Sequence, residues 1–238
     1  MLSTKIICPI GPASDSPKKL AELAEAGMNI ARLNFSHGTH HSHKKIIEQI
    51  RKLNKDRQYP IAIMLDTQGP EIRTGDKVIT LISGKRVCVT IPPNEESEGE
   101  LFVNYVDLKD DLKEGSCISL DGGLMSLKVC GKNKKGLDCE VIDGGVVKAH
   151  RHVNLPGAIV KLPGITETDK RDILFGIEQK VDVIALSFVR SSETIHEVRD
   201  LLGEQAHHIK IIAKIENQEG VDRLVEIVQE ADGVMVAR

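Results

Sequence analysis

The feature that most constrains the fold is an alternation, repeated along most of the chain, between short apolar runs and helical patterns. Residues 5–10 form a run rich in β-branched side chains, and Ser16 and Pro17 after it are typical of a helix start. Repeated strand–helix units of this length indicate a parallel sheet covered by helices. We predict strands at 5–10, 29–35, 61–66, 182–188, 208–215 and 233–238, and helices at 17–26, 39–54, 166–179, 191–202 and around 221–228.

A second region breaks this alternation. Between about residues 77 and 153 the pattern predicts strands only, and Asp-Gly-Gly occurs as a turn signal at 121–123 and again at 143–145. Two prolines within 154–164 indicate a linker that returns to the first pattern. We therefore predict the first part of a barrel domain at 1–69, an inserted β-rich lid domain at 70–160, and the second part of the barrel at 161–238.

The number of strand–helix units bears on the type of sheet. About six units are visible, whereas a closed (β/α) barrel needs eight. An open, doubly wound sheet is the alternative, but such sheets usually begin with a glycine-rich phosphate turn, and the first turn here is GPASDSP. We favour an α/β fold of the TIM-barrel type that is incomplete, with a small β-barrel-like domain inserted after the third strand.

Composition excludes several classes of function. The net charge of −3 offers no basic field for nucleic acid, and aromatic residues make up only 3% of the chain. No apolar run is long enough to span a bilayer, and the first residues lack the order of a signal peptide. The five cysteines are odd in number and form no CxxC pair, which favours reduced thiols. We predict a cytoplasmic protein that binds neither nucleic acid nor membrane.

A cluster of histidines at 36–43 raises the question of a transition-metal site. The members are His37, His40, His41 and His43. No cysteine or carboxylate joins them, and the last three fall on the first turn of a predicted helix whose apolar stripe begins later. We therefore predict that these last three are solvated histidines near a helix start, and that the cluster is not a zinc site.

Polar side chains gather where the predicted strands end. In the strand at 29–35, Arg32, Asn34 and the following Ser36 share one face, and such groups are costly to bury in a barrel unless they bind something. Cations, carboxylates and hydroxyls together suit an anionic, phosphorylated substrate and a hard metal ion. The other strand-end residues are Asp66, Thr67, Ser187, Arg190, Lys214, Glu216 and Arg238.

Five segments resemble pyruvate kinase, in order and in spacing. They are MNIARLNFSHG, IMLDTQGPEIRTG, VNLPG, ALSFVR and IIAKIENQEG, and the resemblance runs from Thr4 to Arg238. It implies a TIM-type barrel with an inserted β-domain. It also implies a glycolytic enzyme that transfers the phosphoryl group of phosphoenolpyruvate to ADP, giving pyruvate and ATP, with Mg²⁺ (or Mn²⁺) and K⁺ as cofactors.

The resemblance also assigns residues. Lys214 would stabilise the transferring phosphoryl group and the enolate, and Arg32 and Arg73 would contact phosphate groups. Glu216 would hold Mg²⁺, and the acidic residue Glu71 goes with K⁺ dependence. The expected K⁺ ligands are Asn34, Ser36, Asp66 and Thr67, and the expected ADP/ATP site comprises Arg32, Asn34, His37 and Arg151.

Members of this family have longer sequences than the segment that the resemblance covers. Family members continue into a GDLG segment, whose Asp is a second Mg²⁺ ligand, and then into a C-terminal domain. We therefore expect the chain alone to be inactive, and longer family members to be homo-oligomers, with a tetramer expected. The alternatives are a non-catalytic truncated fragment or another Mg²⁺-dependent barrel enzyme acting on phosphoenolpyruvate or pyruvate, such as an aldolase-like lyase. The GPEIRTG segment followed by the insertion argues against the lyase.

Overall fold

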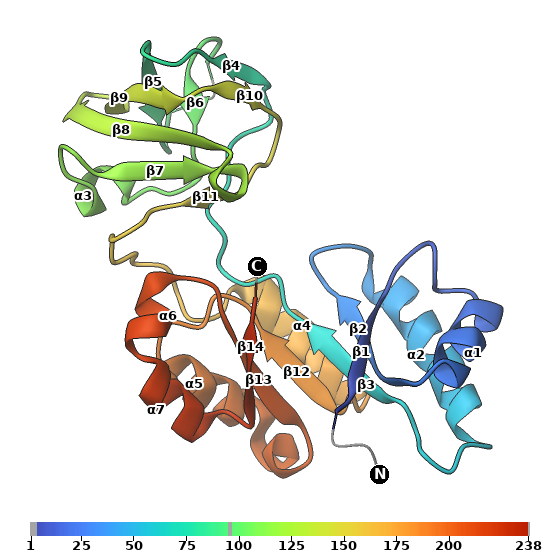
Figure 1. Cartoon of the computed structure of the whole chain (residues 1–238). Coiled ribbons are helices and arrows are strands. Elements are labelled where there is room, and N and C mark those ends of the chain that lie inside the picture. Colours follow the sequence, from blue (N-terminus) through green and yellow to red (C-terminus); the bar gives the residue numbers. More distant parts are fainter. Residues whose placement is uncertain (1–3, 95–96, 238) are drawn as a thin grey trace. The chain divides into compact units, whose positions relative to one another are not determined.

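The computed structural model describes residues 4–94 and 97–237 (Figure 1). Arg238, which ends the last predicted strand, lies outside the described residues. The chain divides into two compact units. One unit comprises Met1–Pro70 and Pro163–Arg238, and the other comprises Glu71–Leu162.

The first unit is built on a six-stranded parallel sheet whose strands follow one another in chain order. A doubly wound sheet would reverse its strand order, so this arrangement is that of a barrel wall. The predicted α/β class with an incomplete TIM-type barrel is confirmed. The strands are β1 (Ile6–Ile10), β2 (Met28–Asn34), β3 (Ala62–Asp66), β12 (Val183–Leu186), β13 (Lys210–Ile215) and β14 (Gly233–Val236).

Helices connect these strands, and side-chain caps fix where several of them begin. The Ser16 hydroxyl accepts the Lys19 amide, and Thr39 and Thr166 each form a capping box. Across the described residues, none of the helices has the length and apolar character needed to cross a bilayer. The helices are α1 (Pro17–Glu25), α2 (His40–Asn54), α4 (Glu167–Glu178), α5 (Ser192–Leu202), the 3₁₀ turn η2 (Gly203–His207), α6 (Gln218–Asp222) and α7 (Leu224–Glu230).

The prediction of one continuous helix around 221–228 is wrong. At Arg223 the backbone leaves the helical region, with φ −103° and ψ 16°. This residue ends α6 and precedes α7, so the apolar positions on either side of it belong to two short helices.

The two faces of the parallel sheet differ in chemistry because successive strand residues point to opposite sides. Leu33, Leu65 and Ile184 are fully buried and belong to the core that includes the helices. The opposite face carries a small apolar cluster of Met64, Val183 and Ala185. By the same alternation, four polar residues near the C-terminal ends of their strands fall on this second face. They are Arg32, Asn34, Asp66 and Lys214.

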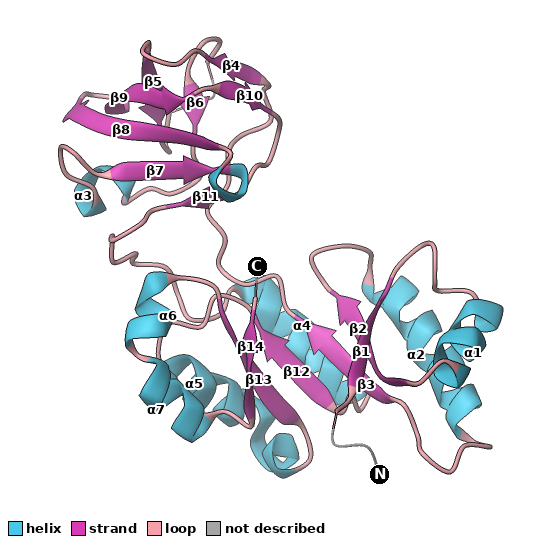
Figure 2. Ribbon diagram, in the orientation of Figure 1, coloured by secondary structure: helices cyan, strands magenta, loops and turns pink. Residues whose placement is uncertain are grey.

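The second unit is almost entirely β-structure with a core of its own (Figure 2). Its main sheet is antiparallel except for the β5–β6 pair, and β4 and β10 form a separate antiparallel pair. Its elements are β4 (Ile79–Leu81), β5 (Arg86–Thr90), β6 (Leu101–Phe102), α3 (Leu108–Asp111), β7 (Cys117–Leu120), η1 (Asp121–Gly123), β8 (Met125–Lys132), β9 (Gly136–Asp143), β10 (Gly145–Val147) and β11 (Val153–Asn154).

Truncating a side chain at the sheet–helix interface should destabilise the first unit. Leu33→Ala removes a fully buried side chain and should lower the free energy of unfolding by about 2–5 kcal/mol, because a cavity remains. Leu174, which is 50% exposed on α4, provides the matched control, and its truncation should cost about 1 kcal/mol or less. Urea denaturation measures both. Equal losses would contradict the placement of this core.

Candidate functional site

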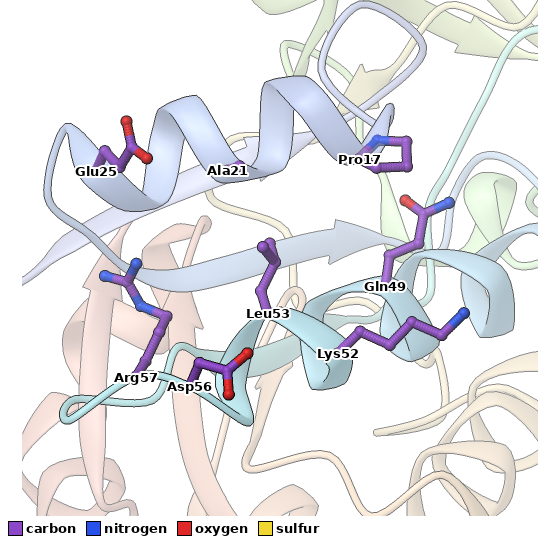
Figure 3. A pocket seen from close by; sticks show the side chains of 8 residues that line it. All are labelled: Pro17, Ala21, Glu25, Gln49, Lys52, Leu53, Asp56 and Arg57. Atoms are coloured by element: carbon purple, nitrogen blue, oxygen red, sulfur yellow. The ribbon is translucent and has the colours of Figure 1, made fainter.

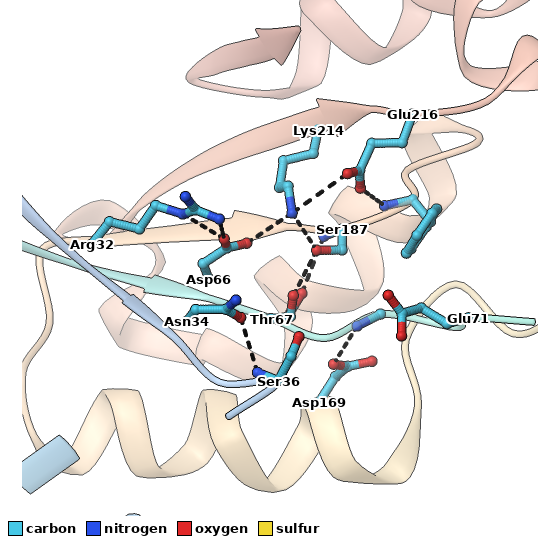
Figure 4. A network of polar contacts seen from close by, with 12 residues as sticks. Arg32, Asn34, Ser36, Asp66, Thr67, Glu71, Asp169, Ser187, Lys214 and Glu216 are labelled. Carbon is cyan, nitrogen blue, oxygen red and sulfur yellow. Dashed lines mark hydrogen bonds and ion pairs between the residues drawn. The ribbon is translucent and has the colours of Figure 1, made fainter. Parts of the chain in front are cut away.

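A network of charged side chains occupies the C-terminal end of the parallel sheet (Figure 4). Its centre is Asp66, at the end of β3, which is 1% exposed. Arg32 Nε and Nη2 lie 2.6 and 2.5 Å from Asp66 Oδ2, and Lys214 Nζ lies 3.0 Å from Oδ1. A buried carboxylate requires such partners, because an unpaired buried charge is strongly destabilising. The predicted residues Arg32, Asp66 and Lys214 are thus brought into direct contact.

Lys214 is itself buried at the end of β13 and has a second partner. Its Nζ donates to Ser187 Oγ at 2.7 Å. Glu216 lies on the same strand face, with Oε1 3.7 Å from Nζ, which is an ion pair beyond hydrogen-bond length. The network therefore holds one ammonium among two carboxylates and a hydroxyl.

The loop that follows β3 is held by backbone and hydroxyl contacts. The Thr67 amide donates to the Ala185 carbonyl at 3.0 Å. Thr67 also accepts twice from Ser187, at its hydroxyl from the Ser187 amide and at its carbonyl from Ser187 Oγ. After β2, the Ser36 amide donates to Asn34 Oδ1 at 3.0 Å, which folds that strand end into a turn. His37 follows this turn, and its amide donates to the Asn34 carbonyl.

A buried carboxylate that sequence reasoning passed over anchors the same loop. Asp169 has no exposed surface, and its Oδ2 accepts from the Thr166 amide and hydroxyl as part of the α4 capping box. Its other oxygen, Oδ1, accepts the Gly69 amide at 3.0 Å. The spacing of Thr166 and Asp169 predicts the cap, but no signal in the sequence reveals the partner 100 residues away.

Two predicted site residues, Arg73 and Arg151, belong to the β-rich unit. The Arg73 guanidinium pairs with the Glu71 carboxylate and donates from Nη1 to the His150 carbonyl at 2.8 Å. Arg151 Nη1 lies 3.6 Å from Asp121 Oδ1.

The donor atoms at the strand ends suit hard cations. Carboxylate, amide, hydroxyl and carbonyl oxygens suit hard ions such as Mg²⁺. Here they belong to Glu216, Asp66, Asn34, Ser36 and Thr67. Within the described ranges, no three side chains of His, Cys, Asp or Glu form a group that could hold a metal ion.

The histidines at the start of α2, predicted to be solvated, differ in exposure. His41 is exposed, but His43 is only 7% exposed and stacks on Phe35 at a ring distance of 4.1 Å. His40 Nε2 lies 2.6 Å from Asp172 Oδ1, and its ring stacks on Phe175 at 4.3 Å. The prediction is therefore wrong for His43, because the Phe35 ring that covers it lies just after β2, outside the helix.

Burial also favours the neutral form of His43. His43 Nε2 lies 2.9 Å from the His37 carbonyl, which can only accept, so Nε2 carries the hydrogen. Burial lowers the pKa of His43, and its buried Nδ1 has no partner among the described residues. Burial likewise raises the pKa of Asp172, although the bond to His40 opposes this. A neutral His43 thus ties helix α2 to the His37 backbone.

A cavity of about 520 Å³ lies away from these residues, between α1 and α2 (Figure 3). Its lining mixes Lys52 and Arg57 with Glu25, Asp56 and apolar side chains. None of the residues predicted to act in catalysis or binding lines it, so the strand-end network remains the candidate site.

Comparison with known proteins places the chain among kinases. A model of the pyruvate kinase barrel domain matches residues 1–238. Pyruvate kinases of Staphylococcus aureus strains USA300, NCTC 8325 and N315 are each 48% identical to the chain over 243 residues. These alignments cover 100% of the chain and 42% of each relative. The chain thus spans less than half the length of these relatives.

The buried histidine should make stability depend on pH. Above its ordinary pKa of 6.5, His43 is neutral whether the chain is folded or unfolded, and stability is fully present. As the pH falls below 6.5, the unfolded chain gains the proton first, so stability is lost by up to about 1.4 kcal/mol per pH unit. Urea denaturation at pH 7.5 and 5.5 should show a smaller loss for His43→Gln than for the unchanged protein. His41→Gln, at an exposed position, should behave like the unchanged protein, and equal losses in all three would contradict the assignment.

Proposed function

The chain belongs to the pyruvate kinase family, and from this membership we propose that the protein transfers the phosphoryl group of phosphoenolpyruvate to ADP, giving pyruvate and ATP. The observation that carries the proposal is the buried Lys214 ammonium at the strand ends. Asp66 and Ser187 orient it before any ligand arrives. A cation fixed in this way stabilises developing negative charge without reorganising during the reaction.

In the proposed reaction, Lys214 faces the phosphoryl group as it leaves the enolate oxygen and then stabilises the enolate. Phosphoryl transfer depends almost entirely on positioning and charge, so one compact, oriented cation has a large effect. Arg32 contributes in the same way. Its Nε and Nη2 bind Asp66, and the side chain is 29% exposed, which leaves other guanidinium N–H groups for a phosphate oxygen.

Cations complete the proposed site through the oxygens already described. Bound Mg²⁺ or Mn²⁺ would neutralise phosphate charge, with Glu216 as the protein ligand. We assign K⁺ to Asn34, Ser36, Asp66 and Thr67. The proposed ADP/ATP site comprises Arg32, Asn34, His37 and Arg151, and Arg73 is the remaining proposed phosphate contact.

We also propose an organisation for the protein as a whole. Residues 1–69 and 161–238 serve as the barrel domain, and residues 70–160 serve as an inserted β-rich lid domain. The protein assembles as a homo-oligomer, with a tetramer as the expected form, and works in the cytoplasm.

Removing the Lys214 charge should abolish most turnover. Lys214→Met should lower kcat of the intact protein by at least ~10²-fold, the scale of losing one preorganised donor. Lys210→Met is the control, because Lys210 begins the same strand but is exposed and pairs with Asp232. Pyruvate formation from phosphoenolpyruvate and ADP is followed with coupled lactate dehydrogenase, and circular dichroism checks folding. Near-normal turnover by folded Lys214→Met would exclude the role, and no pyruvate from the unchanged intact protein would exclude the function.

The intact protein should also require K⁺. K⁺ would compensate part of the negative charge of Glu71 and Asp66. Without that ion, these carboxylates would repel an anionic substrate more strongly. Replacing K⁺ by tetramethylammonium should remove most activity, and Glu71→Lys should restore part of it by supplying a fixed cation. Steady-state rates across the two salts measure this. Equal rates with and without K⁺ would count against the K⁺ assignment.

A further inference from the structure

Lys214 in β13 and Glu216 just after this strand form an ion pair, but the two side chains are too far apart for a hydrogen bond. Lys214 Nζ and Glu216 Oε1 are 3.7 Å apart, although both side chains are nearly buried. Opposite charges in such a place attract strongly. Other contacts must therefore hold each group back.

Ser187 holds the ammonium. Its hydroxyl hydrogen is directed to the Thr67 carbonyl at 2.6 Å, so its oxygen is left to accept from Lys214 Nζ at 2.7 Å. Asp66 accepts a second Nζ hydrogen at 3.0 Å. An ammonium has three hydrogens, so one of them remains directed away from these two partners.

Phe188 holds the carboxylate through its backbone. Its amide donates to Glu216 Oε2 at 2.9 Å, which leaves Oε1 as the oxygen nearer to Lys214. Phe188 has φ +56°, a left-handed conformation that costs a residue other than glycine about 1 kcal/mol or more. The observed bond to Glu216 depends on this conformation, because it sets the direction of the amide.

Gly69 packs closely against the turn at Ser187 and restricts its conformation. A Cβ at Gly69 would lie 2.7 Å from Ser187 Cβ and 3.0 Å from the Ser187 carbonyl oxygen, so only glycine allows this approach. Asp169 fixes the Gly69 amide in turn. Strained backbone persists only where its surroundings determine it fully, and these contacts supply that condition.

We propose that Ser187 and Phe188 form a positioning element that keeps Lys214 and Glu216 from closing on each other. One ammonium hydrogen and one carboxylate oxygen therefore stay available, the first for a phosphate and the second for a divalent cation. The identity of these ligands rests on the proposed function, whereas the positioning itself is a property of the turn.

Two substitutions at Phe188 separate backbone from side-chain effects. Phe188→Gly removes the whole side chain but adopts a positive φ freely, so Mn²⁺ affinity should stay within about threefold. Phe188→Val keeps more packing, but a β-branched residue resists this conformation, so the amide should turn away and Mn²⁺ should bind about tenfold more weakly. Electron paramagnetic resonance titration of the intact protein with Mn²⁺ alone measures both. Weaker binding by the glycine variant than by the valine variant would overturn the proposal.

Ser187→Ala tests whether the Ser187 hydroxyl positions the Lys214 ammonium. The ammonium should move onto Glu216, so a crystal structure of the variant should show the Nζ–Oε1 distance falling below 3.2 Å. We expect kcat to fall by 10- to 100-fold with a smaller change in KM, since charge-assisted hydrogen bonds contribute on this scale. Ser126→Ala, which removes a hydroxyl bonded to Asp143 in the other unit, should change neither kcat nor the distance.

The readouts separate this inference from the proposed function. An unchanged Nζ–Oε1 distance in Ser187→Ala would overturn the positioning role even if the protein is a pyruvate kinase. A shortened distance, with the glycine and valine variants in the expected order, would support it even if the intact protein produces no pyruvate.

Discussion

The arrangement of the strand ends depends on one buried ion pair, between Asp66 and Lys214. Asp66 is 1% exposed, so its charge must be compensated by groups from neighbouring strands. Arg32 from β2 and Lys214 from β13 supply that compensation, and Ser187 after β12 orients the lysine. Removing both cations would leave the buried Asp66 charge unpaired, which costs about 3–5 kcal/mol. The same contacts therefore stabilise the sheet and prepare it to bind anions.

The predictable part of the fold follows from short-range rules. The alternation of strand and helix patterns is visible because buried parallel strands and capped helices have distinct local signatures. Period-two alternation alone indicates that Arg32 and Asn34 share a face, and that Lys214 and Glu216 do too. The convergence of these residues then follows from the rule that parallel strands end at the same edge of a sheet.

The features that the sequence does not predict depend mostly on contacts with residues far away in the chain. Nothing local indicates that Asp169 binds Gly69, or that the Ser187 hydroxyl is directed at the Thr67 carbonyl. The burial of His43 depends on Phe35, which lies outside its helix. The interruption at Arg223 is hidden as well, because the apolar positions on both sides of it keep a helical spacing.

The inserted β-rich unit has a consequence for the order in which the chain folds. Strands β3 and β12 are neighbours in the sheet, yet the Ile63 amide and the Asp182 carboxylate that join them are 119 residues apart. Closing so long a loop costs entropy, and such non-local pairing is slow. The insert has its own sheet and apolar core, so its early collapse would shorten the effective loop and bring Gly69 near Asp169. The completion of the parallel sheet is then kinetically coupled to the folding of a unit that contributes none of its strands.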